Sequence, residues 1–270
     1  QVHQPFLGLE AFRPENQALF FGRAAESEAL ANRIRRSGLV TVTGASGCGK
    51  SSLVLAGVVP RLAGHHVVSV RPGLEPLRRI QESLGRALQV PAAELDTPDA
   101  VVRRCLERDI RLVLFVDQAE ELLTLTTEAS VRAELTDWIA HLGTGGPTRV
   151  VLTVRSDFFA RLSIGALKGR LDREVMVVGA PERPQLRDVL LEPARLAGYT
   201  WEPGLVESLV SAVEGDPSGL SLLQFCATRL WERRDQSWKR PTHEAYAKLG
   251  GVEGAIATHA EATFSALPKS

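Results

Sequence analysis

The 270 residues are enough for one or two domains, and a hydrophobic content of 44% is ample for a buried core. The 32 basic residues balance the 32 acidic ones, which argues against a general polyanion binder, so nucleic acid is not an expected partner. The three cysteines lie far apart and the six histidines lack ligand spacing, so free thiols in a reducing cytoplasm are the simplest interpretation. No apolar run reaches the roughly 18 residues of a membrane span and no signal sequence opens the chain, which predicts a cytoplasmic protein without a membrane segment. Because the first residue is Gln1 rather than Met, we expect a fragment of a longer polypeptide.

Aromatic and apolar residues lead into the first predicted helix. They run from Pro5 to Phe12 and return in Phe20-Phe21-Gly22-Arg23, directly before a helical pattern over residues 24–36. The turn formed by Phe21, Gly22 and Arg23 lies close to the first strand in sequence, so its flat apolar surface could cover an adenine ring. The alternative is that this N-terminal segment simply packs on the domain.

A glycine-rich turn follows the first apolar strand, which is predicted over residues 39–43. The turn fits the phosphate-loop pattern G-x-x-x-x-G-K-[ST], in which backbone N–H groups cradle the phosphates of a nucleotide. Lys50 brings a positive charge to the β and γ phosphates, and Ser51 offers a hydroxyl to Mg²⁺. The predicted nucleotide-binding residues of the loop are Gly44, Ala45, Ser46, Gly47, Cys48, Gly49, Lys50, Ser51 and Ser52.

A continuous apolar run over residues 112–117 ends in a carboxylate. Such a run is typical of a parallel strand buried on both faces, so Asp117 is expected at the carboxyl edge of the sheet, where it could hold Mg²⁺. Glu120 and Glu121 follow, and either carboxylate could polarise the water that attacks the γ phosphate. The alternative is that both glutamates are acids in the first turn of a helix, where the helix dipole favours them.

A later apolar strand, predicted over residues 150–154, ends in Arg155. In sheets of the additional-strand type this strand lies between the phosphate-loop strand and the Asp117 strand, so Arg155 would face the γ phosphate and report its presence. Alternatively, Arg155 could pair with Asp157 or cap the next helix.

The order of the elements predicts an α/β fold. We expect a P-loop NTPase domain of the additional-strand type, with a parallel five-stranded sheet flanked by helices, followed by a small all-helical domain. The NTPase domain with its lead-in is expected over residues 1–180 and the helical domain over residues 181–249. The predicted strands are residues 39–43, 66–70, 112–117, 150–154 and 174–178, and the predicted helices include residues 24–36, 74–88, 97–108, 131–142, 183–196, 204–213 and 219–233.

With these motifs, the chain resembles the STAND class of P-loop NTPases, which is related to the NACHT and AP-ATPase families, and most closely the first group of novel STAND NTPases of bacteria. Besides the phosphate loop, the strings that carry the resemblance are Phe20-Phe21-Gly22-Arg23, Asp117-Gln118-Ala119-Glu120-Glu121 and Leu152-Thr153-Val154-Arg155-Ser156-Asp157-Phe158. The resemblance implies a switch that holds ADP when idle, exchanges it for ATP and assembles into homo-oligomers. It also implies an upstream effector domain and a downstream sensor domain in the same polypeptide, a truncated winged helix that starts in residues 250–270, and a role in bacterial defence or signalling.

One string departs from the family pattern. Relatives usually have a proline after the leucine of a Gly-Leu-Pro-Leu-like contact to the nucleotide, whereas this chain has Ser221 in Gly219-Leu220-Ser221-Leu222. The resemblance therefore does not carry a nucleotide contact over to this position.

Three functional hypotheses follow. The first is an ATP- and ADP-binding signalling switch with slow Mg²⁺-dependent hydrolysis, and the second is a scaffold that nucleotide stabilises but that does not turn over. The third is a GTPase, but the sequence has no Asn-Lys-x-Asp string to read guanine, which favours adenine. For the first hypothesis the candidate catalytic residues are Glu121, Glu120, Lys50 and Arg155, the candidate metal ligands are Ser51 and Asp117, and the candidate nucleotide contacts outside the loop are Phe21, Gly22 and Arg23.

Overall fold

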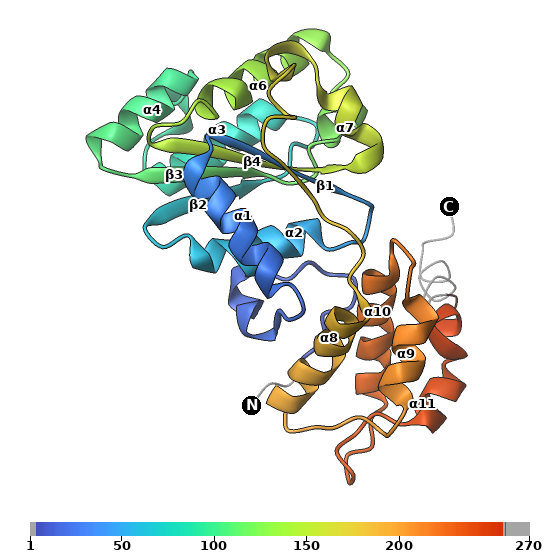
Figure 1. Ribbon diagram of the computed structural model, residues 1–270. Coiled ribbons are helices and arrows are strands. Elements are labelled where there is room, and N and C mark those ends of the chain that lie inside the picture. Colours follow the sequence, from blue (N-terminus) through green and yellow to red (C-terminus); the bar gives the residue numbers. More distant parts are fainter. Residues whose placement is uncertain (1–3, 256, 258–270) are drawn as a thin grey trace, which may run out of the picture. The chain divides into compact units, whose positions relative to one another are not determined.

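The structure is a computed structural model that describes residues 4–255 and 257. It forms two compact units (Figure 1). The sheet unit consists of Ala25–Ala45 and Val58–Val178, and the helical unit consists of Gln1–Ala24, Ser46–Gly57 and Gly179–Ser270. The phosphate loop is therefore shared, with its first two residues in the sheet unit and its remainder in the helical unit. The division predicted at residue 180 rests on the sequence pattern alone and stays a prediction.

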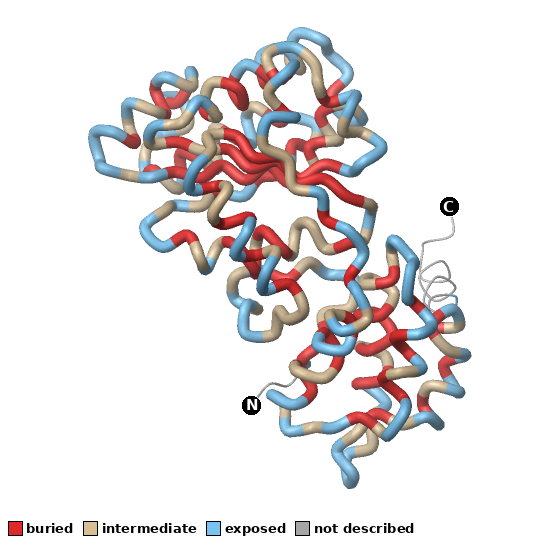
Figure 2. Tube along the Cα trace, in the orientation of Figure 1, coloured by how far each residue is buried: buried red, intermediate tan, exposed pale blue. Residues whose placement is uncertain are grey.

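The sheet unit is built on five parallel strands in the order β2-β3-β4-β1-β5. The position of β4 between β1 and β3 is the one predicted for a sheet of the additional-strand type. Figure 2 shows the three central strands, β1, β3 and β4, as the most completely buried part of this unit, as expected of parallel strands covered on both faces, whereas the edge strands β2 and β5 are partly exposed. The strands are β1 (Leu39–Gly44), β2 (His65–Val70), β3 (Arg111–Val116), β4 (Thr148–Arg155) and β5 (Val175–Val177).

Helices cover both faces of this sheet. In Figure 1, α3, α4 and α6 lie on one face and α1 lies on the other. The predicted N-cap of α4 is present, because the Thr97 hydroxyl accepts a hydrogen bond from the N–H of Ala100 at 3.3 Å. The helices and turns of this unit are α1 (Ala24–Arg36), η3 (Val59–Arg61), α3 (Pro76–Leu88), η4 (Ala92–Glu94), α4 (Pro98–Glu107), α5 (Glu121–Thr124), α6 (Ala129–Leu142), α7 (Ser156–Leu162) and η5 (Gly165–Leu167).

The helical unit has its own core, and the N-terminal segment is part of it. The Phe6 side chain is fully buried, and its ring lies 5.9 Å from the ring of Trp201 and 5.8 Å from that of Trp231. The Trp201 indole N–H donates to the carbonyl of Leu190 at 3.0 Å, which satisfies its polar atom. The elements of this unit are η1 (Pro14–Leu19), α2 (Lys50–Ser52), the π-helical turn η2 (Leu53–Val58), α8 (Arg183–Leu196), α9 (Leu205–Val213), α10 (Gly219–Glu232) and α11 (His243–Lys248).

Two properties of the chain bear on the sequence predictions. Cys48, Cys105 and Cys226 are free and buried. Within the described residues, no helix combines the length and the apolar character that crossing a membrane demands. The predicted start of a winged helix in residues 250–270 lies outside the described residues except for residues 250–255 and 257.

Candidate functional site

The phosphate loop begins where β1 ends. Gly44 is the last residue of β1, and the loop returns to helical backbone at Lys50, the first residue of α2. Gly47 and Gly49 have φ angles of +76° and +92°, which only glycine adopts readily, so both positions need the residue that the motif supplies. The Lys50 ammonium lies 3.9 Å from the Cys48 sulfur, and both Lys50 and Ser51 are partly exposed.

The string Phe20-Phe21-Gly22-Arg23 reaches the phosphate loop through its arginine. The Arg23 side chain is buried, and its Nη2 donates to the carbonyl of Gly179 at 2.8 Å and to that of Cys48 at 3.3 Å. Arg23 thus holds the loop and the segment that follows β5 through backbone carbonyls. Phe21 and Gly22 are half-buried, and their predicted contact with the nucleotide stays a prediction.

The carboxyl edge of the sheet gathers the predicted polar residues of the sheet unit. Gly44 pairs with Arg155 across β1 and β4, and Asp117 follows directly after β3, the neighbour of β4. Asp117 is only 6% exposed, and its Oδ1 accepts a hydrogen bond of 2.6 Å from the hydroxyl of Thr153 on β4. Thr153 therefore fixes one oxygen of the candidate metal ligand.

The turn after Asp117 is fastened to β4 by its backbone as well. The N–H of Gln118 donates to the Thr153 hydroxyl at 2.9 Å, and the N–H of Ala119 donates to the Thr153 carbonyl at 2.8 Å. Gln118 has a φ angle of +58°, an uncommon backbone conformation for a residue other than glycine. One threonine therefore holds both the carboxylate and the turn behind it.

Arg71 approaches the same carboxylate from the end of β2. Its Nε lies 3.5 Å from Asp117 Oδ2, and its Nη2 donates to the side-chain oxygen of Gln118 at 2.7 Å with the amide oriented to satisfy both of its ends. In that orientation the Gln118 amide nitrogen donates to Glu121 Oε1 at 3.2 Å, while Glu121 Oε2 accepts from the N–H of Gly73 at 2.9 Å. Glu121 is thus engaged with the loop after β2.

Glu120 points to the other side of the turn. Its Oε2 accepts a hydrogen bond from the N–H of Arg155 at 3.3 Å, so this carboxylate lies at the end of β4. The Arg155 guanidinium forms an ion pair of 2.8 Å with Asp157, one of the two alternatives that the sequence left open. Arg155 also occupies the N-cap position of α7, but its side chain makes no capping hydrogen bond there.

The donor set fits a magnesium ion held together with a nucleotide. Mg²⁺ is usually bound by one or two protein oxygens plus substrate phosphates and water. Ser51 carries a hydroxyl and Asp117 a carboxylate, which are oxygen donors of that kind; their joint binding of one ion stays a prediction. In the part of the chain that the structure describes, no group of three or more His, Cys, Asp or Glu side chains could hold a metal ion by itself.

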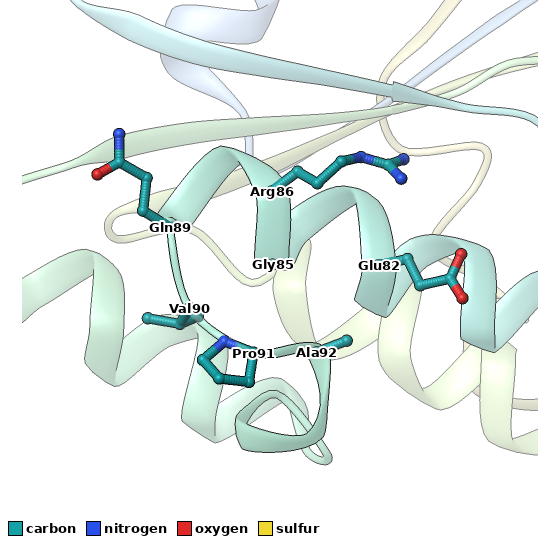
Figure 3. Close-up of a pocket in the computed structure, with 7 residues that line it drawn as sticks. All are labelled: Glu82, Gly85, Arg86, Gln89, Val90, Pro91 and Ala92. Carbon is teal, nitrogen blue, oxygen red and sulfur yellow. The ribbon is translucent and has the colours of Figure 1, made fainter.

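Thr153 and Arg71 are the site residues that the sequence analysis missed. Each carried a signal: Thr153 is a polar residue inside the apolar run of β4, and Arg71 directly follows β2, whose carboxyl end lies at the same edge as that of β3. A shallow hollow of about 490 Å³ at the C-terminal end of α3 and the turn behind it is lined by none of the candidate site residues (Figure 3). The 13 residues of α3 place it about 20 Å along the helix from the carboxyl edge.

Comparisons with known proteins identify the family and the fold. The profile of the family described as Novel STAND NTPase 1 matches residues 5–270, and among curated proteins none matches the chain significantly. Among solved structures, the chain is similar to a Walker-type ATPase of Pyrococcus abyssi, with 15% identity and a TM-score of 0.63 over 94% of this chain and 74% of that chain. It is similar to the ORC2 protein of Aeropyrum pernix in its ADP form, with 18% identity and a TM-score of 0.66 over 88% of this chain and 69% of that chain. It is also similar to the ORC1 protein of Aeropyrum pernix in complex with DNA, with 19% identity and a TM-score of 0.62 over 91% of this chain and 67% of that chain. At these identities the likeness concerns the fold, and it confirms the predicted P-loop NTPase architecture.

Proposed function

Because the chain belongs to the novel STAND NTPase 1 family, we propose that it is an ATP- and ADP-binding signalling switch that hydrolyses ATP slowly with Mg²⁺. Nucleotide binding is typical of this family. The observation that carries the proposal is the arrangement at the carboxyl edge of the sheet, where β1 runs into the phosphate loop and β4, with Arg155 at its end, separates it from the Asp117 strand. Ligands of open α/β sheets bind at this edge.

Each group of the proposed site has a role that follows from its chemistry. The loop N–H groups bind the phosphates, Lys50 neutralises the β and γ phosphates, and Ser51 and Asp117 would hold the metal. When bound, Mg²⁺ would neutralise the negative charge that develops on the phosphates. Thr153 keeps the Asp117 carboxylate oriented, since its hydroxyl donates to Oδ1.

Glu120 is the better candidate for positioning the attacking water. Its carboxylate lies at the end of β4, next to the strand that enters the phosphate loop, and it is held there by a single backbone N–H at 3.3 Å. Glu121 accepts hydrogen bonds from Gly73 and Gln118 and so holds the loop after β2. Arg155 senses the γ phosphate by leaving Asp157, an exchange that costs little because both side chains are exposed.

The remaining parts of the proposal rest on the family. The chain acts in the cytoplasm as part of a longer polypeptide, between an effector domain and a sensor domain, and forms homo-oligomers when it exchanges ADP for ATP. The output is bacterial defence or signal transduction. Nucleic acid is not proposed as a partner, because 32 basic and 32 acidic residues leave no net charge.

One observation favours the second hypothesis, a scaffold that binds nucleotide without turnover. Two of the four candidate catalytic side chains bind groups that an incoming γ phosphate would have to displace, since Glu121 accepts from Gly73 and Gln118 and Arg155 pairs with Asp157, whereas Glu120 accepts one backbone hydrogen bond. If the contacts of Glu121 and Arg155 persist with ATP bound, only Lys50 and Glu120 remain to act on the γ phosphate.

Two measurements test the proposal. Calorimetric titration with ADP and ATP should show that Lys50→Ala weakens binding by roughly 10- to 100-fold, the loss expected for charge-assisted hydrogen bonds, while Lys168→Ala, at an exposed lysine of the sheet unit, leaves affinity unchanged. Equal affinity of the Lys50→Ala variant and the wild type would remove the phosphate-loop assignment.

Phosphate release with Mg²⁺ then separates the switch from the scaffold. Glu120→Gln should abolish slow turnover with ADP affinity intact, whereas Glu121→Gln should retain most of it. If the wild type and Glu120→Gln release phosphate at the same negligible rate, the scaffold hypothesis stands.

A further inference from the structure

The outer side of the phosphate loop is held by side chains from outside the loop. Ser218 Oγ donates to the carbonyl of Ser46 at 3.5 Å, and Ser221 Oγ donates to the carbonyl of Gly47 at 2.9 Å. The next carbonyl along the loop accepts from the buried Arg23 guanidinium at 3.3 Å. All of these residues belong to the helical unit. Three successive carbonyls of the loop are therefore bonded by side chains, one by the N-cap residue of α10, one by its first turn and one by Arg23.

The same turn of α10 packs against the loop without a gap. A Cβ atom added at Gly47 would lie 2.9 Å from Ser221 Oγ, and one added at Gly49 would lie 3.0 Å from Leu220 Cδ2. Both close atoms are at the ends of side chains, so the positive φ angles are the main reason for glycine at these positions, and the missing Cβ atoms let the α10 side chains approach the loop.

Holding a carbonyl also sets the direction of an N–H group. In a planar trans peptide the C=O and the following N–H point in opposite directions, and the described residues contain no cis peptide bond. A hydrogen bond to the carbonyl of Gly47 therefore turns the N–H of Cys48 to the opposite side of the loop. In the same way, the hydrogen bonds to the carbonyls of Ser46 and Cys48 turn the N–H groups of Gly47 and Gly49 away from those carbonyls. These are the donors that a phosphate group needs from such a loop.

We infer that Ser221 is a positioning residue for phosphate binding: its hydroxyl orients the loop from behind, so the affinity of the loop for phosphate groups depends on how α10 is seated. This inference rests on the proposed function, because it assumes that the loop binds nucleotide phosphates. It gives Ser221 a role that a proline could not have at this position, since proline has no hydroxyl to donate. Ser218 assists through a longer and weaker hydrogen bond.

Ser221→Ala tests the inference through affinity for two compounds. The hydroxyl-to-carbonyl hydrogen bond contributes about 1 kcal/mol to the order of the loop, so its loss predicts up to roughly fivefold weaker binding of ADP and also of inorganic pyrophosphate, which has no base. Ser218→Ala should weaken the binding of ADP and of pyrophosphate by a smaller factor. Unchanged affinity for both compounds would overturn the inference, and so would a loss confined to ADP, which would place Ser221 at the nucleotide base.

The matched control is Ser208→Ala. Ser208 is an exposed serine on α9 of the same unit, and its hydroxyl also donates to a backbone carbonyl, that of Gly204 at 3.1 Å. Ser208→Ala loses the same kind of hydrogen bond, but that bond does not involve the phosphate loop. The affinities of this variant for ADP and pyrophosphate should therefore equal those of the wild type. A fivefold loss in this variant would attribute the Ser221 effect to general destabilisation.

Hydrogen exchange without nucleotide separates this inference from the proposed function. The amides of residues 47–49 should exchange faster in Ser221→Ala than in the wild type or Ser208→Ala, because their peptide groups lose an anchor. If the wild type binds neither ADP nor pyrophosphate, the proposed function fails, and the exchange rates still decide whether Ser221 orders the loop. Equal rates in all three proteins would refute the ordering.

Discussion

The hydroxyl of Thr153 gives the most direct test of how the candidate metal carboxylate is held. Thr153 is 1% exposed, donates to Asp117 Oδ1 at 2.6 Å and accepts from the N–H of Gln118 at 2.9 Å. Thr153→Val keeps the shape of the side chain but removes both bonds. The bond to the carboxylate contributes about 2 kcal/mol and the bond from the amide about 1 kcal/mol, and no water replaces them in a buried site. The free energy of unfolding of Thr153→Val should therefore be about 3 kcal/mol lower than that of the wild type.

Calorimetric unfolding measures this loss. A loss of about 3 kcal/mol corresponds to a melting temperature lower by roughly 6–12 °C, and faster hydrogen exchange in residues 111–124 and 148–155 should locate the effect in the sheet unit. The matched control is Thr144→Val. Thr144 is exposed and donates to the carbonyl of His141 at 2.8 Å, so water can replace its hydroxyl and the change should stay within about 0.5 kcal/mol.

Thr153→Val should also change how strongly Mg²⁺ affects ATP binding. With its Oδ1 released, the Asp117 carboxylate loses its fixed orientation, so the gain in ATP affinity that Mg²⁺ provides should shrink in Thr153→Val and stay unchanged in Thr144→Val. The reasoning is refuted if Thr153→Val melts within 2 °C of the control, a margin of about 0.5–1 kcal/mol. It is equally refuted if Mg²⁺ strengthens ATP binding by the same factor in both variants.

Three further predictions concern other parts of the chain. Gly22→Ala should destabilise the helical unit by about 1–3 kcal/mol in urea unfolding, because φ is +78° and the new Cβ would lie 2.7 Å from the carbonyl of Gln185; a loss below 0.5 kcal/mol, roughly the scatter of surface substitutions, would contradict this. Burial raises the pKa of Cys105 to about 11 and that of Cys226 to about 12, so both thiols should resist alkylation at pH 8 until urea unfolds the chain; rapid native labelling of either would oppose this prediction. ATP should compete with a labelled nucleotide better than GTP, and equal competition would reopen the guanine alternative.

The elements of the fold could be predicted from the sequence because each carries its own periodicity. The helical pattern over residues 24–36 and the apolar run of β3 are local signals, and the N-cap at Thr97 is a local hydrogen bond. A helix was expected after Arg155, but its bounds could not be predicted, because Ser156–Leu162 has only one buried residue to mark them. The π-helical turn after Lys50 was missed because its apolar residues fit an ordinary helix equally well.

The partners of the site residues could not be predicted in the same way. Thr153 and Asp117 are 36 positions apart, and Ser221 and Gly47 are 174 apart, so these contacts depend on how the chain folds back on itself. The sequence identified Ser221 as a departure from the family pattern, but only the structure shows that its hydroxyl has a partner in the phosphate loop.

The proposed division of roles between Glu120 and Glu121 depends on the backbone of one residue. Gln118 has a φ angle of +58°, which glutamine seldom adopts, and this bend directs the chain so that Glu120 reaches the end of β4 while Glu121 reaches the loop after β2. Sequence alone leaves two adjacent carboxylates equivalent, since both follow the same strand. Because the bend is held by hydrogen bonds from Gln118 and Ala119 to Thr153, a change at that threonine should disturb both glutamates as well as Asp117.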